Sequence, residues 1–425
     1  GNRAAAYAPV HDLGLVALWD DGDDLLAEQR APYPHAREVL ALRAHDSQAA
    51  ALFAGYARTA EVQAWIERGW LRELADDRAV VRHTAPRVRV TADSDFALER
   101  DAAARAARLP HEVFDMMRAA LPQGPVLVSV PRAGYLVALV CQECREPARC
   151  GFCGGPTRVP ATGPGESATV RMSCGWCGRL QTDWECPICG SPRVRAPIVG
   201  AERTAEELGK AFPQTPVRQS IGGRRIAGVA DTSAIVVATP GAEPSAVGGY
   251  AGAVLLDTPL LLLRQDLRAG EEALRRWLNV VALVRSGVDG GSVIAVGESS
   301  GRALQALVRI DPGGFATREL ADRVAARFPP AVTLITVEGS SDALTEFVSL
   351  LHPPPHAELL GPAEPDVKRS AADGAAETVI QRLMLRAPLS ERHQLVQAVK
   401  ETAAIRSARK SSGPLRIRVD PVDLG

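Results

Sequence analysis

The amino-acid sequence predicts an α/β protein that carries a cysteine-rich insertion and ends in a smaller α+β domain. Three observations lead to this prediction. Short apolar runs alternate with amphipathic helical stretches along most of the 425 residues, which is the pattern of a parallel sheet. All eight cysteines lie between positions 141 and 189, inside that alternation. From residue 319 onward, strands and helices follow one another in the order of a split βαβ domain.

The first part of the chain is expected to hold one strand and two helical stretches. The strand covers residues 14–19 and ends in an acidic cluster, at the point where α/β folds bind their ligands: Asp20, Asp21, Asp23 and Asp24. Helical periodicity extends over residues 36–70 and 93–120. A turn at Pro122 then leads into a buried strand at 126–130, and the cysteines follow directly.

Strand and helix signals alternate again after the cysteines. The expected elements are helix 202–212, strands 233–239 and 253–256, helix 271–283 and strand 292–296. We interpret the apolar run at 255–263 as a buried strand and its edge. The last part is expected to contain strand 332–337, helix 343–350, a linker rich in Pro and Ala, strand 378–385, helix 392–405 and strand 415–419.

The cysteines form four C-x-x-C pairs: Cys141/Cys144, Cys150/Cys153, Cys174/Cys177 and Cys186/Cys189. A pair with this spacing places two thiolates on one metal from a single tight turn, and tetrahedral Zn²⁺ takes two such pairs. The sequence therefore predicts two zinc sites. We favour a nested arrangement, in which the two outer pairs hold one ion and the two inner pairs hold the other, over sequential pairing. Sharp turns are expected where a glycine follows a pair, at Gly154, Gly178 and Gly190.

Two other interpretations of the cysteines are weighed against zinc. Disulfides need an oxidising compartment, yet no secretory signal is visible and the cysteines are confined to one part of a large chain. Two iron–sulfur clusters could use eight thiolates, but the ferredoxin run C-x2-C-x2-C-x3-C-P is absent. With four cysteines each, both zinc sites would be closed to water, so we expect them to be structural and not catalytic.

The overall charge does not indicate a nucleic-acid-binding protein, because the net charge is −1 and the pI is near 6.8. Any such contact must come from local groups of basic and aromatic side chains. Our candidates are Arg145, Arg149, Arg179, Trp176 and Trp184 beside the cysteines, with Arg406, Arg409 and Lys410 near the C-terminus. The alternative is that the arginines are solvated and the rings form the module's own core. We prefer that core interpretation for Phe152.

Other classes of protein are not indicated. The eight histidines do not cluster, and we predict no catalytic residue. The longest apolar stretch, at 254–263, is too short to span a bilayer, so we expect a soluble protein with no membrane partner. The chain begins with Gly and has no initiator Met, so we expect it to be part of a longer protein.

Several segments resemble the family of the primosomal replication restart protein PriA. They are the stretch 126–135 before the cysteines, Cys186-Pro-Ile-Cys-Gly-Ser191 within them, the opening Gly-Asn-Arg-Ala-Ala-Ala-Tyr-Ala-Pro9, Tyr33-Pro-His-Ala-Arg37, Leu360-Gly-Pro362 and Val419-Asp-Pro-Val422. The resemblance covers the full chain, and the cysteine spacing is its most specific part. It implies a DNA-binding protein that recognises stalled or branched forks, works with primosome and single-strand-binding proteins, and helps load the replicative helicase.

The resemblance also implies an architecture of two RecA-like helicase lobes. On that basis, residues 1–122 are the C-terminal part of the first lobe, and residues 123–140 with 196–318 form the second lobe. Residues 141–195 are the inserted zinc-binding module, and residues 319–425 are the C-terminal α+β domain. Members of the family act in DNA replication, repair and recombination, so a cytoplasmic, nucleoid-associated monomer is implied.

Three motifs depart from the family pattern. The Walker B box D-E-E-H aligns with Trp19-Asp20-Asp21-Gly22, so the first acid has become a tryptophan. The G-S-A-T-P motif is replaced by residues 55–59, Gly-Tyr-Ala-Arg-Thr. The final motif Q-x-x-G-R-x-G-R aligns with residues 279–286, where Leu283 and Ser286 take the arginine positions. Arginines of this kind accelerate phosphoryl transfer by about 10³- to 10⁵-fold in related NTPases, so we expect no productive use of ATP. The expected cofactors are the two Zn²⁺ ions. The chain resembles a branch of the family that lacks the motor.

Two other functions remain open from the sequence. An active ATP-dependent 3′→5′ helicase could use Asp20 and Asp21 in a shifted register. A zinc-ribbon protein for RNA or transcription, with no role at forks, would also carry this cysteine pattern.

Overall fold

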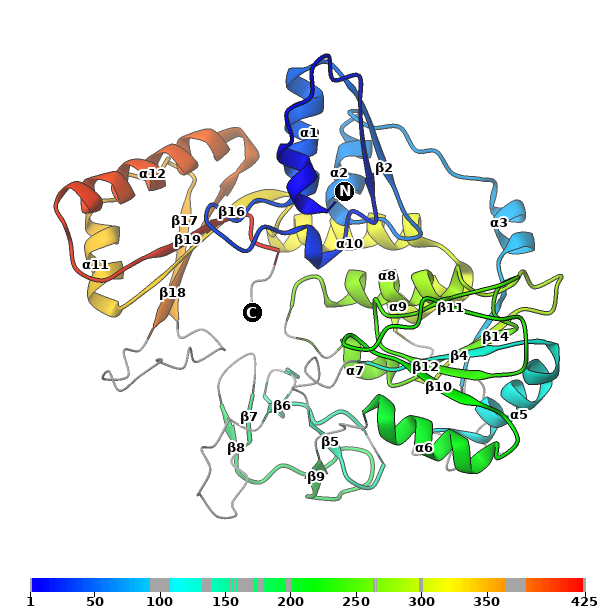
Figure 1. Ribbon diagram of the computed structural model, residues 1–425. Coiled ribbons are helices and arrows are strands. Elements are labelled where there is room, and N and C mark those ends of the chain that lie inside the picture. The colour runs from blue at the N-terminus through cyan, green and yellow to red at the C-terminus, as the bar shows by residue number, and fades with distance from the viewer. Residues whose placement is uncertain are drawn as a thin grey trace. The chain divides into compact units, whose positions relative to one another are not determined.

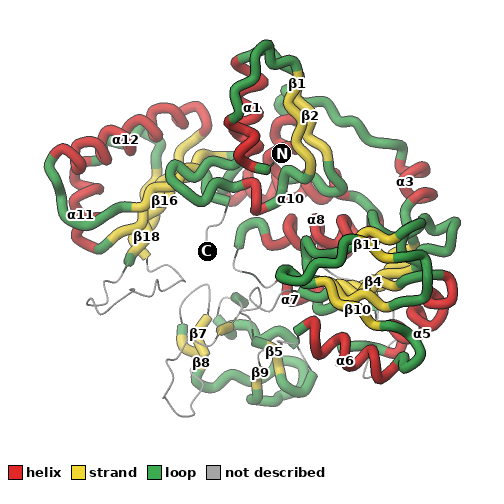
Figure 2. The backbone as a smooth tube through the Cα atoms, viewed as in Figure 1, coloured by secondary structure: helices red, strands yellow, loops and turns green. Residues whose placement is uncertain are grey.

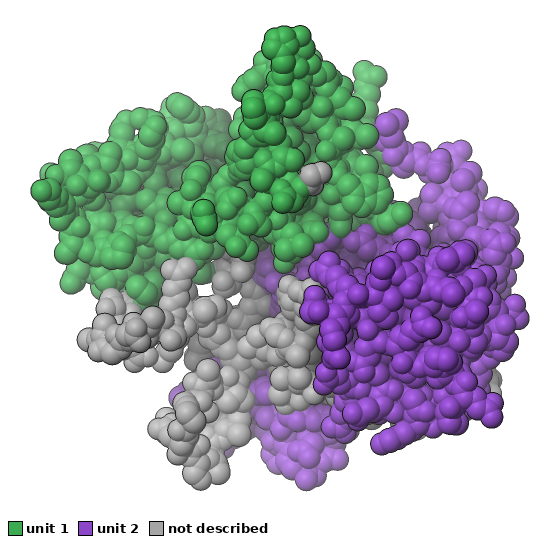
Figure 3. Space-filling view, in the orientation of Figure 1, with its two compact units in different colours: residues 1–73, 313–425 green, residues 74–312 purple. Residues whose placement is uncertain are grey.

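The structure, a computed structural model of the 425-residue chain, describes residues 2–91, 108–131, 139–144, 146–152, 154–155, 157–158, 172–174, 179–195, 200–262, 264, 266–297, 301–363 and 380–422. The chain divides into two compact units, which Figure 3 colours separately. Residues 1–73 and 313–425 form the first unit, and residues 74–312 form the second. No helix in the described ranges is both long and apolar enough to cross a bilayer.

A six-stranded parallel sheet is the centre of the second unit (Figure 1). Its strands are arranged in the order β10 (Val217–Ser220), β12 (Ile235–Ala238), β4 (Val126–Ser129), β14 (Gly252–Leu255), β15 (Ser292–Ala295) and β3 (Arg87–Val90). All five neighbouring pairs are parallel, and the apolar residues of β12, β4 and β14 are fully buried. The predicted parallel sheet is therefore confirmed. Strand β3 precedes the predicted lobe boundary at residue 122.

Helices cover both faces of this sheet, as strands buried on both sides require. Val113, Met117 and Leu208 of α5 (His111–Ala120) and α6 (Ala201–Ala211) pack on one face, against residues such as Val128 and Val237. The other face carries α8 (Ala269–Val281) and α9 (Arg302–Arg309) (Figure 1). The remaining elements of this part are α3 (Arg78–Thr84), α7 (Thr258–Leu262), the 3₁₀ turn Leu121–Gln123 and the small pair β11 (Gly228–Val229) and β13 (Ser245–Ala246).

Two secondary-structure predictions are wrong. The apolar run at 255–263 is not a strand and its edge, because β14 ends at Leu255 and α7 begins at Thr258. Asp257 has a positive φ of 55°, which ends the strand, and Pro259 suits the first turn of a helix. The helical stretch predicted at 36–70 is interrupted by a strand, as the first unit shows. The structure describes only the end of the helix predicted at 93–120, because residues 92–107 lie outside the described ranges.

The N-terminal part of the first unit contains two parallel strands with helices beside them. Strand β1 (Leu15–Trp19) pairs with β2 (Ala50–Ala54), and α1 (Ala36–Asp46) and α2 (Ala60–Glu67) follow each strand in turn. Gln48, with a φ of 52°, turns the chain between α1 and β2. The 3₁₀ turns Arg3–Tyr7 and Asp24–Leu26 and the helix α10 (Pro312–Ala326) complete this part. Ala60 and Ala64 of α2 pack on Leu320 of α10.

The C-terminal part of the first unit is an antiparallel sheet with two helices (Figure 2). The chain order is β16 (Val332–Gly339), α11 (Ser341–Leu350), β17 (Glu358–Ala363), β18 (Gln381–Pro388), the 3₁₀ turn Leu389–Glu391, α12 (Arg392–Ala408) and β19 (Arg416–Val419). The strands lie in the order β17, β18, β16, β19, and Ile335, Leu385 and Phe347 join the apolar core under the helices. This is the predicted split βαβ domain. Strand β17 lies in the stretch predicted as a linker.

Candidate metal centre

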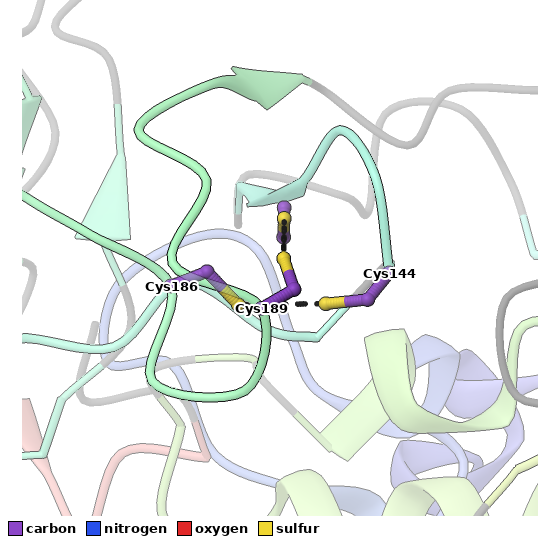
Figure 4. Close-up of side chains that lie close together, drawn as sticks. Cys144, Cys186 and Cys189 are labelled. Carbon is purple, nitrogen blue, oxygen red and sulfur yellow. Dashed lines mark hydrogen bonds between the residues drawn. The ribbon is translucent and has the colours of Figure 1, made fainter.

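The four cysteines of the two outer pairs meet at one point. Their sulfur atoms all lie within 4.8 Å of one another, and Figure 4 shows those of Cys144, Cys186 and Cys189 converging. The Sγ atoms of Cys141 and Cys189 are 3.5 Å apart, and those of Cys144 and Cys186 are 3.4 Å apart. Four sulfurs at about 2.3 Å from a tetrahedral Zn²⁺ would be about 3.8 Å from each other, so this set fits the ion. The structure thus brings together the set that nested pairing predicts.

Two short strands hold the ends of this segment side by side. Strand β5 (Val140–Cys141) pairs antiparallel with β9 (Val194–Arg195), so Cys141 lies opposite Val194. The main-chain N–H of Gln142 donates to the carbonyl of Arg193 at 2.9 Å and extends this pairing. The first and last cysteine pairs therefore meet although they are more than forty positions apart in the sequence.

The first cysteine of every pair forms the same main-chain turn. Its N–H donates to the carbonyl oxygen five residues later, at 2.8 Å for Cys141, 2.7 Å for Cys150, 2.8 Å for Cys174 and 3.0 Å for Cys186. In two of these turns a glycine N–H closes a second bond of 2.9 Å, from Gly154 to Cys150 and from Gly190 to Cys186. Both glycines have positive φ, 70° and 71°, a conformation that glycine adopts without strain. Gly178 lies outside the described residues.

The pKa values of Cys141 and Cys144, two of the outer cysteines, are shifted. Burial acts to raise the pKa of Cys141, but N–H groups of Cys144 and Glu143 and the thiols of Cys189 and Cys144 outweigh it, and the pKa falls to about 7. Burial raises the pKa of Cys144 to about 12, and the neighbouring thiols add to the rise. Four sulfurs at this distance would repel one another as thiolates unless a cation lies between them. The donor set therefore suits a soft divalent ion such as Zn²⁺.

The inner pairs are described in part. Cys150 and Cys174 are buried, whereas Cys153 and Cys177 lie outside the described residues. The sulfur of Cys150 accepts two hydrogen bonds of 3.4 Å, from the main-chain N–H of Phe152 and from Nε2 of Gln181. Strand β7 (Met172–Cys174) pairs with both β6 (Thr157–Arg158) and β8 (Leu180–Gln181), which carries that glutamine. Gln181, seven residues after Cys174, belongs to no recognised motif, so nothing in the sequence marks it as a neighbour of the cysteines.

The aromatic residues beside the cysteines differ from expectation. Trp184 is 8% exposed and packs with Leu139 and Met172, and its indole N–H donates to the carbonyl of Arg149 at 3.1 Å. It is a core residue, so the prediction that it contacts DNA is wrong. Phe152 is 67% exposed, so the core interpretation of this ring is wrong as well. The guanidinium group of Arg179 covers the ring of Phe152 at 3.7 Å.

The basic candidates also separate into two groups. Arg149 and Arg179 are exposed beside the cysteines, and Nη1 of Arg149 donates to the carbonyl of Gly154 at 3.2 Å. Arg145 and Trp176 lie outside the described residues.

Near the C-terminus, Arg406 is 6% exposed, because it bonds Glu346 at 2.9 Å and the carbonyl of Ser412 at 2.9 Å. The prediction that Arg406 contacts DNA is therefore wrong. Arg409 and Lys410 are exposed at the end of α12.

The acidic residues after β1 do not form an open metal site. Asp21 is 5% exposed, and its Oδ2 accepts a hydrogen bond of 2.5 Å from Oγ1 of Thr59. Arg37, which is also buried, lies 3.4 Å from Asp21 and 3.5 Å from Glu61. Burial raises the pKa of Asp21, against the lowering effects of Arg37 and Thr59. The loop after β1 is thereby bonded to the loop after β2, which the parallel pairing of the two strands brings to the same edge.

The arginine positions of the final motif are occupied by residues with other roles. Leu283 donates and accepts main-chain hydrogen bonds with Val280 and Tyr250, and Ser286 bonds Asp289 at 2.6 Å in a tight turn. Arg285, between them, donates to the carbonyls of Gln123 at 2.8 Å and of Gly248 and Gly249 at 3.1 Å. It also pairs with Asp231. These bonds hold Arg285 within its own loop.

The chain is similar to proteins of one known family. A family model described as "Primosomal protein N C-terminal domain" matches residues 324–422. "Probable replication restart protein PriA" of Mycobacterium leprae is 47% identical over 427 residues, which is 100% of this chain and 65% of the relative. The protein with the same description from Mycobacterium tuberculosis H37Rv is 45% identical over 435 residues, or 100% and 66%. "Replication restart protein PriA" of Treponema pallidum is 28% identical over 91% of this chain and 59% of the relative. The chain therefore spans about 65% of the length of the mycobacterial relatives.

Proposed function

Because the chain belongs to the PriA family of replication restart proteins, we propose that it binds branched DNA at stalled forks and helps to load the replicative helicase there, without acting as a motor. The observation that carries this proposal is the 47% identity that extends over the whole chain, through the cysteine module and the C-terminal domain alike. Its partners would be forked DNA, primosome proteins and single-strand-binding proteins, and it would act as a monomer at the nucleoid.

The two α/β parts would be the remains of a helicase architecture. The six-stranded parallel sheet with helices on both faces would be the second RecA-like lobe. The pair β1 and β2, with α1 and α2, would be the C-terminal part of the first lobe. Parallel strands occur almost only in sheets covered on both faces, and Leu15, Trp19 and Leu52 of this pair are exposed apolar residues. This exposure supports the assignment of the pair to a larger sheet.

The loss of motor activity rests on what has replaced the catalytic groups. Trp19, 59% exposed, stands where the family has the acid that orients Mg²⁺ on the nucleotide. Of the two acids that follow it, Asp21 has a carboxylate that is buried and already bonded to Thr59 and Arg37. Neither Leu283 nor Ser286 can stabilise charge on a transferred phosphoryl group, and Arg285 is held by its own loop. We therefore propose that ATP is not hydrolysed.

The cysteine module would bind two Zn²⁺ ions. The outer ion would be held by Cys141, Cys144, Cys186 and Cys189, whose sulfurs already lie together. The inner ion would be held by Cys150, Cys153, Cys174 and Cys177. The shared main-chain turn at the first cysteine of all four pairs supports this second site. Both sites would be closed, so the ions would stabilise the module and take no part in a reaction.

The module would contact DNA through exposed groups beside the inner site. Phe152 offers a ring to an unpaired base, and Arg149 and Arg179 offer charge to phosphates. Arg145 and Trp176 remain proposed contacts on the same segment of sequence. Arg409 and Lys410 would supply a second, weaker contact at the end of α12. Because these residues touch backbone and stacked bases, the affinity should depend on salt and on DNA structure more than on sequence.

One experiment separates this proposal from an active helicase. ATP hydrolysis and binding of a forked DNA are measured on the same sample of intact protein, with and without the fork. Binding with no turnover supports a restart scaffold without a motor. Turnover stimulated by the fork would mean that Asp20 or Asp21 serves as the catalytic acid, and would restore the helicase function. Preference for single-stranded RNA over the fork would instead indicate a role in RNA metabolism or transcription.

A further inference from the structure

The second unit contains a pocket of about 440 Å³ that no motif of the sequence marks. The end of α3, the start of β3, the turn before β15 and the end of α9 surround it. The described residues that line it include Arg82, His83, Arg87, Val288, Val308 and Arg309. A volume of this order accommodates a ligand about the size of one nucleotide.

The lining is strongly basic. Arg82, Arg87 and Arg309, all exposed, line it from three different elements, and His83 lies beside them. Within the part of the chain that the structure describes, none of the three guanidinium groups takes part in an ion pair or side-chain hydrogen bond. Among the residues that the structure describes, none of those lining the pocket is acidic. Three positive charges that line one pocket repel one another, and an anion bound there would relieve that repulsion.

The pocket is distinct from the sites considered above. It lies at the amino ends of β3 and β15, because Arg87 begins β3 and Gly287 and Val288 precede β15. Ligands of α/β sheets usually bind at the opposite edge, beyond the carboxyl ends of the strands. Residues of that edge, such as Asp257 and Thr91, do not line the pocket. The site is therefore independent of any nucleotide site inherited from a helicase lobe.

Its shape depends on a close approach of two segments. The main-chain N–H of Gly287 donates to the carbonyl of Ala85 at 3.0 Å. A Cβ atom at position 287 would lie 3.1 Å from that carbonyl oxygen and 3.3 Å from Cγ of Arg87, so glycine lets the two segments meet. Val288 and Val308, 66% and 43% exposed, give the pocket an apolar wall beside its charges. A phosphate ester, which joins charge to an apolar sugar edge, matches both features.

We propose that this pocket binds a phosphate ester, and that its source is the backbone of the DNA that the protein engages. The proposal rests on the proposed DNA-binding function. Arg82, Arg87 and Arg309 would surround one phosphate and its neighbours, and Val288 and Val308 would contact the sugar. Guanidinium groups suit this task because each presents several donors in a fixed plane. The pocket would add to the affinity for DNA without reading its sequence.

The test compares two triple variants with the same change in charge. Arg82→Ala/Arg87→Ala/Arg309→Ala removes the pocket charges, and Arg203→Ala/Lys210→Ala/Arg218→Ala removes three exposed charges from α6 and β10 of the same unit. The affinity for a forked DNA is measured from 50 to 300 mM salt, with thermal unfolding as a check on folding. We expect the pocket variant to bind about tenfold more weakly at 0.1 M salt, with a log–log salt slope shallower by about 1 or more. The control should change less than about twofold.

Two further measurements make the result decisive. Arg82→Lys/Arg87→Lys/Arg309→Lys should recover most of the salt slope, because the charge is restored. Binding of ADP and of inorganic phosphate is measured on the unmutated protein, the alanine pocket variant and the control variant. Loss of ADP binding in the pocket variant, with DNA affinity equal to the control, would assign the pocket to a free nucleotide and overturn the DNA source. If the pocket variant matches the control for all three ligands, the site does not exist. Failure of the unmutated protein to bind the fork would refute the proposed function instead, and the phosphate measurements would still decide the pocket.

Discussion

The guanidinium group of Arg179 lies over the ring of Phe152, 3.7 Å from the ring centroid, on the surface of the cysteine module. The main-chain N–H of Phe152 donates to the sulfur of Cys150, so the ring is anchored next to a proposed metal ligand. An arginine in this position is attracted by the ring quadrupole and limits its rotation. We propose that an unpaired base stacks on this pair.

Replacement of Phe152 by alanine should weaken binding of a fork with a single-stranded arm. Loss of one base-stacking contact is worth about 1–3 kcal/mol, which is about 5- to 150-fold in affinity. Zinc content and unfolding temperature should stay unchanged, because the ring is 67% exposed. Leu180→Ala is the matched control, since Leu180 is 60% exposed on the neighbouring strand β8 and offers no ring. Equal losses in the two variants would show that the aromatic ring has no special role.

Metal analysis should give two zinc ions per chain. Cys186→Ser should lower the content to one by removing a ligand of the outer set, and Cys150→Ser should lower it to one through the inner set. The double variant should bind none, and its module should lose protection from proteolysis, because structural zinc contributes about 10–16 kcal/mol to such folds. Visible absorption from iron, or one ion in the unmutated protein, would contradict the two-zinc assignment.

The variant Arg37→Ala should be strongly destabilised. It leaves the buried carboxylate of Asp21 without its arginine, while Glu61 keeps Arg323 at 3.7 Å, and breaking a buried pair in this way costs about 3–5 kcal/mol. Burial already raises the pKa of Asp21, and removal of Arg37 should raise it further. A raised pKa in the folded state means that stability is lost as the pH rises. Urea unfolding should therefore show a larger defect at pH 8 than at pH 5.

The comparison for that variant is Arg118→Ala. Arg118 forms an exposed ion pair with Asp115 at 3.2 Å, and such pairs contribute less than about 1 kcal/mol. Its defect should not change between pH 5 and pH 8. A defect in Arg37→Ala that is equally small, or equally independent of pH, would refute the role assigned to the buried ion pairs.

The basic residues of α12 should separate by function. Arg406→Ala should lower stability by a few kcal/mol, because it removes buried bonds to Glu346 and to the carbonyl of Ser412, and should leave fork affinity unchanged. Arg409→Ala/Lys410→Ala should weaken fork binding severalfold, make its salt slope shallower and leave stability unchanged, because both side chains are exposed. Thermal unfolding measures the stability of each variant, and fluorescence anisotropy of a labelled fork measures its affinity for DNA. The reverse pattern would restore Arg406 as a contact.

The periodicity of apolar residues predicted the strands that are buried on both faces or on one face along their whole length. The all-apolar strands β12 and β14 and the alternating pattern of β18 in the C-terminal domain are read directly from the sequence. Periodicity failed where a single turn inside an apolar stretch changes the secondary structure from helix to strand or from strand to helix. Positive φ at Gln48 separates α1 from β2, and positive φ at Asp257 separates β14 from α7, and both residue types are also common inside helices and loops. Strands β3 and β10 carry arginines and were missed, because they form the edges of the sheet.

The inner pairs match the ribbon spacing C-x2-C-x15–20-C-x2-C, which predicted that the two outer pairs meet, and the structure places those four sulfurs together. The surroundings of the cysteines could not be predicted in the same way. Trp184 and Phe152 occupy similar places beside a cysteine, yet one is buried and the other exposed. The difference arises from packing against Leu139 and Met172, residues far from Trp184 in the sequence. Arg406 was misassigned for the same reason, since Glu346 belongs to another helix.

Because the Sγ atoms of Cys141 and Cys189 lie 3.5 Å apart and β5 pairs with β9, the two ends of the cysteine module lie side by side. Residues 145–185 are then a closed loop. Its length adds little to the cost of folding, about 0.6 kcal/mol for each doubling. Natural selection can therefore lengthen, shorten or replace this stretch while β4 and α6 on either side keep their places. The pairing of β5 with β9 and the outer cysteines therefore let the module change in evolution while the fold that carries it stays the same.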